Sequence, residues 1–374
     1  MSAPVGIGIV GCGNISGTYL KTLARFPHVR VVAVSDIVVE RAERRAREFA
    51  IPRACSPAEL LADPQVELVV NLTVPAAHGS VAMAALEAGR SVYNEKPLSI
   101  DFAEGRRLVE AAGDRGLRIG GAPDTWLGAS IQQARRVIDA GSIGQPVGVL
   151  AAVAHPGPET WHPDPGFFYQ RGAGPLFDIG PYYVTTLLFL LGPVHRVSGT
   201  ARITFDERPV TGGPRKGDLL AVETPTYVSS VLDFTGGPIG TLITSWDVVA
   251  NELPHIEVHG SEGTLSLPDP NTFQGPLRIR RRDDESWGEL APSEGFAHPG
   301  DRGIGLAELA EAMLAGRPHR ASGDLALHTL EVMSSILEAS DQGRAIELTT
   351  TCERPEPLPA GWMRQAWRTE PVPA

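Results

Sequence analysis

The sequence is poor in cysteine, in positive charge and in long apolar runs, and each shortage excludes a class of protein. Only three cysteines occur among 374 residues, at spacings unlike those of metal ligands, which is typical of the reducing cytoplasm. The formal net charge of -11 argues against nucleic-acid and anionic-membrane partners. No run approaches the roughly 18 apolar residues of a membrane span. The N-terminus has no basic-then-apolar leader, so we expect a cytoplasmic protein.

The most informative stretch lies near the N-terminus. Val5–Val10 is a short β-branched run that predicts a buried strand, and a turn with Gly11 and Gly13 leads from it into a helical pattern. Gly11 permits the tight turn, and Gly13 lets the backbone approach a pyrophosphate, which the N–H groups of the helix start attract. Ser16 stands where this motif has its third glycine, and serine is small enough for the same helix–strand packing. An ordinary strand-to-helix turn is the alternative.

The next strand carries a second sign of a dinucleotide. Val29–Ser35 ends at Asp36, which is 23 residues beyond Gly13. The acid that accepts hydrogen bonds from a ribose hydroxyl is expected at about 20 residues. Its carboxylate would repel a 2′-phosphate, so NAD is favoured over NADP. Asp36 could also cap the helix expected at Val38–Ala50, and the two roles are compatible.

Strands and helices alternate as far as about residue 121, and then the pattern changes. Apolar strands separated by helices predict a doubly wound parallel sheet covered on both faces. Longer, partly alternating strands with Gly/Pro-rich turns then predict a large open, mostly antiparallel sheet with a few helices. We therefore expect an α/β protein with a nucleotide-binding domain at 1–122, an α/β domain at 123–350 and a tail at 351–374. The first domain should hold strands at Val5–Val10, Val29–Ser35, Val66–Leu72, Ser91–Asn94 and Leu117–Gly120, with helices at Asn14–Phe26, Val38–Ala50, Ala76–Gly89 and Asp101–Gly116. The second should hold helices at Leu127–Ala140 and Asp324–Ala339, strands at Val147–Ala154, Val194–Phe205, Tyr227–Phe234, Ile239–Val248, Ile256–Val258 and Leu277–Arg281, and loops at Asp206–Gly217 and Pro268–Gly303.

Ligands of doubly wound sheets bind beyond the carboxyl ends of the strands, which directs attention to two corners. After the third expected strand come Thr73, Pro75 and, about one helical turn on, His78. After the fourth come Glu95 and Lys96 side by side, followed by a proline that fixes the corner, and packing explains such a pair poorly. A half-buried helix histidine and a solvated loop ion pair are the alternatives.

Two stretches of the second half are candidates for substrate binding. Asp178 and Tyr182 are four residues apart in an expected helix, which would place an acid and a phenol on one face. Alternatively, the acid caps the helix and the phenol packs in the core. The loop at 155–169 is dense in aromatic and polar groups that suit carbohydrate, unless those aromatics only pack on one another. Its candidate residues are His155, Trp161, His162 and Asp164, with Asp124 and Trp126 as weaker candidates for the same pocket; no metal is expected.

Together these stretches resemble the glucose–fructose oxidoreductase / inositol dehydrogenase (Gfo/Idh/MocA) family over nearly the whole chain. The Gly11–Ile15 turn, Thr73–His78, Glu95-Lys96-Pro97 and Gly172–Gly180 occur in the family's order, and residues 259–265 look like its late strand–turn–strand. The resemblance implies an N-terminal Rossmann domain, NAD(P), a sugar, cyclitol or related polyol as substrate, and a C-terminal sheet that mediates a homodimer or homotetramer. The implied cofactor-binding residues are Gly11, Gly13, Asn14, Ile15, Asp36, Thr73, Pro75, His78, Glu95 and Lys96.

The chain departs from the family pattern at Ser16, at Val74-Pro75 and in the segment from Asp178 to Tyr182. The last departure replaces the histidine that often serves as acid/base, so Lys96 and Tyr182 both stay candidates for the proton transfer. Our hypothesis is that Lys96 hydrogen-bonds the reacting oxygen, with its pKa lowered beside a cationic nicotinamide. Tyr182 is its expected partner, and Asp178 would orient the substrate.

Three functions agree with these residues. The first is an NAD(P)-dependent dehydrogenase that moves a hydride between the nicotinamide and a secondary alcohol carbon of a sugar, cyclitol or glycoside. The second is an NAD-dependent lyase or glycosidase that acts by transient oxidation, and the third is a non-catalytic, NAD-dependent sugar sensor. Retention of Lys96 and Asp178 favours an enzyme over a sensor.

Overall fold

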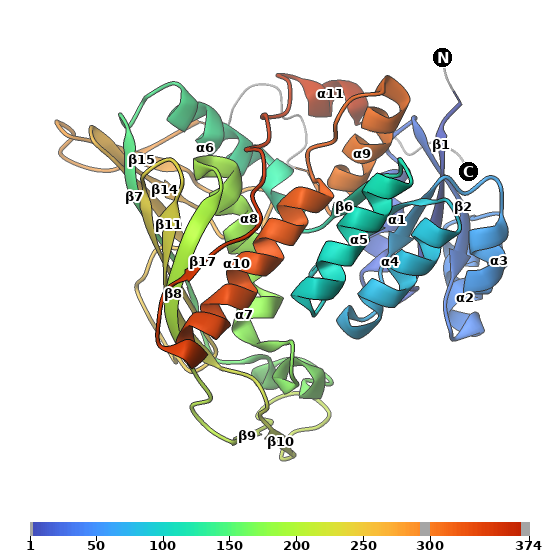
Figure 1. Cartoon of the computed structure of the whole chain (residues 1–374), viewed down its shortest axis with the longest axis horizontal. Helices are drawn as coiled ribbons and strands as arrows, with labels where there is room; N and C mark the ends of the chain where they lie inside the picture. Colours follow the sequence, from blue (N-terminus) through green and yellow to red (C-terminus); the bar gives the residue numbers. More distant parts are fainter. Residues whose placement is uncertain (1–2, 292–299, 368–374) are drawn as a thin grey trace. The chain divides into compact units, whose positions relative to one another are not determined.

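The computed structural model describes residues 3–291 and 300–367 and contains two compact units. Within the described residues, the first unit holds 3–129, 300–327 and 355–367, and the second holds 130–291 and 328–354 (Figure 1). The expected boundaries at 122/123 and 350/351 do not coincide with these units, because residues 123–129, 300–327 and 355–367 also belong to the first one. Parts of the expected loop (292–299) and of the tail (368–374) lie outside the described residues.

Six parallel strands form the sheet of the first unit, in the order β3-β2-β1-β4-β5-β6. Every residue of β1 and β4 is buried, as expected for apolar strands covered on both faces. The strand order reverses between β1 and β4, and ligands of such sheets bind outside the carboxyl ends at that point. The strands are β1 (Val5–Val10), β2 (Val29–Ser35), β3 (Ala54–Cys55), β4 (Leu68–Asn71), β5 (Ser91–Asn94) and β6 (Ile119–Gly121).

The four helices expected in this unit are present and begin or end a few residues inside the predicted limits. Three further helices, α3, α9 and α11, and the short strand β3 were not predicted. Among the described residues, no helix combines the length and the apolar character needed to cross a membrane. The helices are α1 (Ser16–Leu23), α2 (Val39–Glu48), α3 (Pro57–Ala62), α4 (His78–Glu87), α5 (Phe102–Asp114), α9 (Ile304–Ala315) and α11 (Trp362–Ala366).

The second unit is built on a nine-stranded sheet in the order β16-β15-β14-β13-β7-β12-β11-β8-β17. Strands β7 and β12 run parallel and the other neighbouring pairs run antiparallel, which confirms the predicted large, mostly antiparallel sheet. The strands are β7 (Pro146–Ala154), β8 (Val194–Arg202), β11 (Tyr227–Phe234), β12 (Ile239–Ser245), β13 (Ile256–Gly260), β14 (Gly263–Leu267), β15 (Arg278–Arg281), β16 (Gly288–Glu289) and β17 (Ile346–Glu347).

Helices cover one face of this sheet. The Nε2 atom of His328 on α10 accepts a hydrogen bond from the amide of Val194 at the start of β8, and Ser340 of α10 bonds Ala201 further along that strand. Strand β11 alternates exposed and buried residues, so its second face is open. The helices of this part of the chain are α6 (Ala129–Asp139), α7 (Gly174–Asp178), α8 (Gly180–Leu191) and α10 (Gly323–Gln342).

Between β8 and β11 the chain forms a separate two-stranded sheet. Residues 206–217 were predicted to be a loop, but Glu207–Pro209 forms β9, which pairs with β10 (Leu219–Ala221). The prediction was wrong here because the pairing depends on a separate buried cluster that the local pattern does not show. That cluster consists of Tyr169, Val210, Leu220, Val222 and Trp246.

Candidate functional site

The turn between β1 and α1 has the shape that an anion cradle needs. Gly11 has φ +101°, and a Cβ here would lie 2.6 Å from the carbonyl atoms of Leu72, so glycine is required. A Cβ on Gly13 would meet nothing within 4 Å, which leaves room for a ligand beside the backbone. Asn14 follows, and Ile15 is the N-cap of α1 without a side-chain cap. The first amides of the helix therefore suit a pyrophosphate.

Asp36 is fixed beside this turn. Its Oδ2 accepts a hydrogen bond from the amide of Cys12 at 2.7 Å, and its Oδ1 accepts one from the amide of Val38 at 2.8 Å. Each carboxylate oxygen has a second acceptor site, which a ribose hydroxyl could use. Asp36 does not bond the amides of the first turn of α2, which starts at Val39 with no side-chain cap bond.

Two asparagines that the sequence analysis did not consider join the strand ends. Asn71 ends β4 and Asn94 ends β5, and their side chains are bonded at 3.1 Å. The Oδ1 of Asn71 accepts a hydrogen bond from the Thr73 hydroxyl at 2.7 Å, and Asn94 donates to the carbonyl of Leu98 at 2.9 Å. A polar residue at the end of each of two neighbouring apolar strands was the available signal. The Asn71–Asn94 pair therefore fixes the path of the loops that follow β4 and β5, and these loops carry the candidate residues.

His78 supports those loops from within. Its ring is 1% exposed, and its nitrogens lie 2.6 Å from the carbonyl of Pro97 and 3.1 Å from that of Thr73. Burial lowers the pKa of His78 although both carbonyls favour a protonated ring. The buried ring thus supports both loops, and its predicted part in cofactor binding stays a prediction. Pro75 opens a 3-10 turn, Pro75–Ala77, ahead of α4.

The corner formed by Glu95, Lys96 and Pro97 after β5 is held by a tyrosine of helix α1. Tyr19 of α1 donates a hydrogen bond to Oε1 of Glu95 at 2.8 Å, and Oε2 of Glu95 accepts from the amide of Lys96 at 2.9 Å. Burial and the Glu95 carboxylate raise the pKa of Tyr19 well above its ordinary value, which keeps the phenol a donor. Glu95 therefore acts on the backbone of the corner, and Lys96 lies half-buried at its tip.

Asp124 and Trp126 are both buried in this structure. Asp124 is 0% exposed and its Oδ2 accepts hydrogen bonds from the amides of Gly303 and Gly305, which places it at the start of α9. Burial raises the pKa of Asp124 to about 6. Trp126 is 1% exposed within the 3-10 turn Thr125–Leu127. Their predicted contact with substrate stays a prediction.

Asp178 and Tyr182 do not share one helix. Asp178 is the last residue of α7 and Tyr182 lies in the first turn of α8, with Ile179 as the junction. The helix is interrupted because Pro181 has no N–H to donate to the carbonyl four residues back. The expected single helix is therefore wrong, and the joint role of Asp178 and Tyr182 stays a prediction. Asp178 is half-buried and Tyr182 is 5% exposed.

The loop at 155–169 packs partly on itself. The rings of Phe167 and Phe168 stack with their centroids 4.0 Å apart, and the His162 ring contacts both edge-on. This agrees with the alternative that the aromatic residues of the loop pack on one another. Trp161 is 64% exposed and Asp164 is exposed, so these two can reach a ligand. The remaining candidate, His155, has its ring against the carbonyl of the next residue. The sequence analysis did not consider the buried charged side chains that anchor this loop, which are those of Glu159, Arg208 and Asp247.

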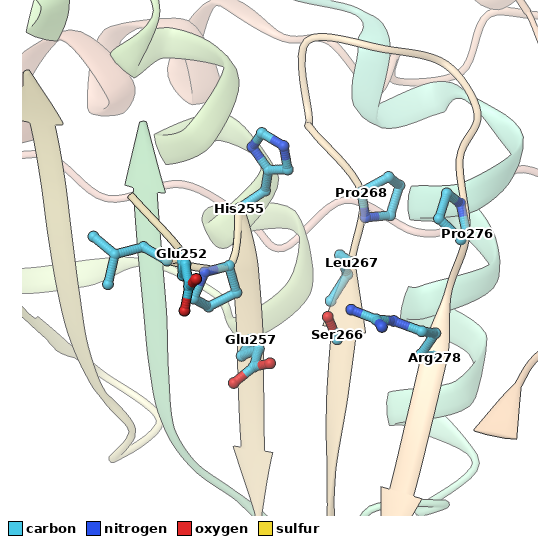
Figure 2. A pocket seen from close by; sticks show the side chains of 10 residues that line it. Glu252, His255, Glu257, Ser266, Leu267, Pro268, Pro276 and Arg278 are labelled. Carbon is cyan, nitrogen blue, oxygen red and sulfur yellow. The ribbon is translucent and has the colours of Figure 1, made fainter. Parts of the chain in front are cut away.

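A pocket of about 340 Å³ opens elsewhere on the second unit, where β13 and β15 begin and β14 ends. Figure 2 shows Glu257, Ser266 and Arg278 on three neighbouring strands, with His255 above them. The ring of His255 lies 3.0 Å from the hydroxyl of Tyr183 on α8. None of the predicted substrate residues lines this pocket, and no motif in the sequence predicted it. Across residues 3–291 and 300–367, no group of three or more His, Cys, Asp and Glu residues is arranged to hold a metal.

The glycine turn, the fixed Asp36 and the parallel sheet define an NAD-binding Rossmann oxidoreductase, and comparisons with known proteins agree. A family model described as "Oxidoreductase family, NAD-binding Rossmann fold" matches residues 5–121, and that of the "GFO/IDH/MocA C-terminal domain" matches residues 131–266. The chain belongs to the GFO/IDH/MocA oxidoreductase family, which confirms the resemblance seen in its sequence.

The relatives include dehydrogenases of several polyols. Inositol 2-dehydrogenase of Salmonella typhimurium is 38% identical over 70% of this chain and 73% of that protein. Trans-1,2-dihydrobenzene-1,2-diol dehydrogenase of Bos taurus is 28% identical over 80% of this chain and 84% of that protein. Among solved structures, an NAD binding oxidoreductase from Klebsiella pneumoniae has a TM-score of 0.80, with 23% identity over 93% of this chain and all of that one. The last likeness concerns the fold.

Proposed function

We propose that this protein is an NAD-dependent dehydrogenase that oxidises or reduces a secondary alcohol carbon of a sugar, cyclitol or related polyol. The observation that carries the proposal is the first unit's arrangement of the glycine turn, Asp36 and the Glu95-Lys96 corner at neighbouring strand ends. The polyol dehydrogenases among its relatives support the substrate class. Asp36 favours NAD over NADP because a 2′-phosphate would meet its carboxylate.

In the proposed reaction, bound NAD supplies the acceptor or donor of the hydride, and the protein positions the groups and handles the proton. Gly11, Gly13 and the first amides of α1 hold the pyrophosphate, and Asp36 holds the ribose. Glu95, fixed by Tyr19, orders the backbone from which Lys96 projects.

The proton-handling groups are proposed residue by residue. Lys96 hydrogen-bonds the reacting oxygen and stabilises the charge that develops on it. Asp178 is proposed to orient the substrate hydroxyls, and Tyr182 is proposed as the partner of the proton transfer. Trp161 and Asp164, the exposed candidates of the 155–169 loop, supply apolar and polar contacts to carbohydrate.

A screen of NAD+ reduction by the full chain tests this function. Absorbance of NADH is followed with panels of free sugars, inositols and glycosides, and with NADP+ in parallel. We expect NADH formation with a subset of polyols and a lower kcat/KM with NADP+. Conversion of a glycoside without net change in NADH would instead identify the lyase or glycosidase, and tight NAD binding without any turnover would identify a sensor.

We also propose that the open face of the nine-stranded sheet joins copies of the chain into a homodimer or homotetramer. Val231 and Ile239 on neighbouring strands of this sheet are 43% and 58% exposed. Clusters of exposed apolar residues on a sheet mark interfaces. Light scattering should show that Val231→Lys dissociates the oligomer, whereas Leu314→Lys, at a 40% exposed position on α9, leaves it intact. A monomeric wild type would contradict the proposal.

A further inference from the structure

The serine that replaces the third glycine of the motif is part of a hydrogen-bonded group. Ser16 is 0% exposed, and its hydroxyl donates to the carbonyl of Gly13 at 2.7 Å. The same hydroxyl accepts a hydrogen bond from Nε of Arg45 at 3.1 Å. A glycine at this position would have no atom to make either bond. The departure from the motif therefore has a structural reason that lies 29 residues away in the sequence.

Arg45 reaches this turn from α2. Its Nη2 donates to the carbonyl of Gly13 at 3.1 Å, so this oxygen receives hydrogen bonds from both side chains. Its Nη1 pairs with Glu48 at 2.7 Å, and its side chain is only 14% exposed. A Cβ on Gly17 would come within 3.2 Å of Nη1, so the glycine at this position makes room for the guanidinium against the first turn of α1.

The direction of the Gly13 carbonyl decides where the next amide points. In a planar trans peptide the C=O and the following N–H point in opposite directions. When Arg45 and Ser16 hold the carbonyl of Gly13, the N–H of Asn14 is turned away from them. The amide of Asn14 belongs to the set that a pyrophosphate at this helix start requires. Fixing the Gly13–Asn14 peptide thus sets the direction in which the N–H of Asn14 points towards the bound phosphates.

The charge of Arg45 also acts at the turn. Burial and the Asp36 carboxylate raise the pKa of the Cys12 thiol to about 11, and Arg45 is the first of the cations that oppose this rise. The guanidinium therefore places positive potential at the segment where the doubly charged pyrophosphate is expected.

We propose that Arg45, acting through Ser16 and the Gly13 carbonyl, is a positioning residue for the dinucleotide phosphates. It keeps the turn in its binding conformation before the cofactor arrives, so less order has to be imposed on binding. The inference concerns affinity for the phosphates, and it does not depend on which polyol is the substrate.

Binding of NADH to the full-length protein, followed by its fluorescence, provides the test. We expect Arg45→Met to weaken NADH binding by roughly tenfold, the effect of about one net hydrogen bond plus a nearby charge. Arg45→Lys should recover only part of the affinity, because one ammonium group cannot make both contacts with the geometry of the fork. The control is Arg47→Met on the same helix, since Arg47 is 73% exposed and pairs only weakly with Glu43, at 3.5 Å. It should bind like the wild type.

Displacement of NADH by ADP and by adenosine separates phosphate binding from a general loss of structure. Arg45→Met should weaken ADP and leave adenosine nearly unchanged. Ser16→Ala should weaken NADH by a few-fold and add little when combined with Arg45→Met, because both changes remove one coupled group. Wild-type NADH affinity in Arg45→Met, equal loss of ADP and adenosine, or full additivity with Ser16→Ala would each overturn the proposal. Should Arg45→Met not fold, Arg45→Lys and Ser16→Ala carry the same test.

Discussion

Arg208 donates two hydrogen bonds to a single oxygen of Glu159, from Nε at 2.9 Å and from Nη2 at 2.7 Å. Its Nη1 bonds Asp247, and the hydroxyl of Tyr169 donates to the other oxygen of Glu159. These side chains come from the 155–169 loop, from β9 and from the segment after β12. One arginine thus ties the loop that carries the exposed Trp161 to the rest of the second unit.

Replacing Arg208 should cost much more stability than replacing a surface arginine. Glu159 and Asp247 are each only 6% exposed, so Arg208→Met leaves two buried carboxylates without their counter-ion. We expect the free energy of unfolding to fall by about 3–5 kcal/mol, as for other broken buried pairs. Urea denaturation followed by tryptophan fluorescence measures it, with Arg196→Met as the control, since the Arg196–Asp233 pair is partly exposed. Equal losses in both variants would show that the buried group does not anchor the loop.

Lys96 is expected to matter for turnover and much less for cofactor affinity. Lys96→Ala should lower kcat by at least about 100-fold, the low end of acid–base contributions, on whichever polyol the screen identifies. NADH binding should stay within a few-fold of wild type, because the cradle and Asp36 are intact. Lys216→Ala removes an exposed lysine and serves as the control. Wild-type kcat in Lys96→Ala would remove this residue from the proposed role.

The sequence was most informative where a local rule decides the structure. Continuous apolar strands and a glycine turn predicted the parallel sheet, since burial on both faces leaves no other reading of such strands. Two local signals were overlooked. Ser56 and Glu59 form a capping box at the start of α3, and Pro181 lacks the N–H that a continuous helix needs.

The contacts that shape the candidate site were out of reach for another reason. The Tyr19–Glu95 bond joins residues 76 apart, and the Arg208–Glu159 bond joins residues 49 apart. In neither bond does the local sequence around one residue predict its partner. Such pairs arise only after the strands have been ordered, so one sequence predicts the strand ends and not the side chains that brace them.

Tyr182 is expected to act through its hydroxyl. Tyr182→Phe should lower kcat and change the pH dependence of kcat/KM, because the phenol is the proposed partner of the proton transfer. Tyr183→Phe is the matched control, as its hydroxyl contacts His255 and has no proposed part in the reaction. A pH profile that is unchanged in Tyr182→Phe would assign the proton transfer to Lys96 alone. A comparable fall in kcat for both variants would point to packing of α8 instead.

His328 should make the protein less stable in mild acid. Its Nε2 accepts the amide of Val194, and burial lowers the pKa of His328 to about 4 from an ordinary value of 6.5. Because the folded form has the lower pKa, this stabilisation is complete above pH 6.5 and is lost as the pH falls towards 4, by roughly 3 kcal/mol. Unfolding free energies at pH 7 and 4.5 should differ less in His328→Gln than in wild type. His195→Gln, at a half-exposed position, should keep the wild-type difference.

Asp124 should make the protein less stable as the pH rises, which is opposite to the effect of His328. Its folded pKa is about 6 and its ordinary value is 3.8, so its contribution to stability is complete below pH 3.8 and is lost as the pH rises through 6. The shift corresponds to roughly 3 kcal/mol, the cost of burying the charged form. Asp124→Asn is neutral at every pH and still offers an oxygen to the amides of Gly303 and Gly305. Relative to wild type, this variant should therefore gain stability between pH 4.5 and 7.5 in urea denaturation, whereas Asp114→Asn, at an exposed position of α5, should not. A constant difference between Asp124→Asn and wild type over that range would mean that Asp124 is charged throughout and that the α9 amides compensate fully for its burial.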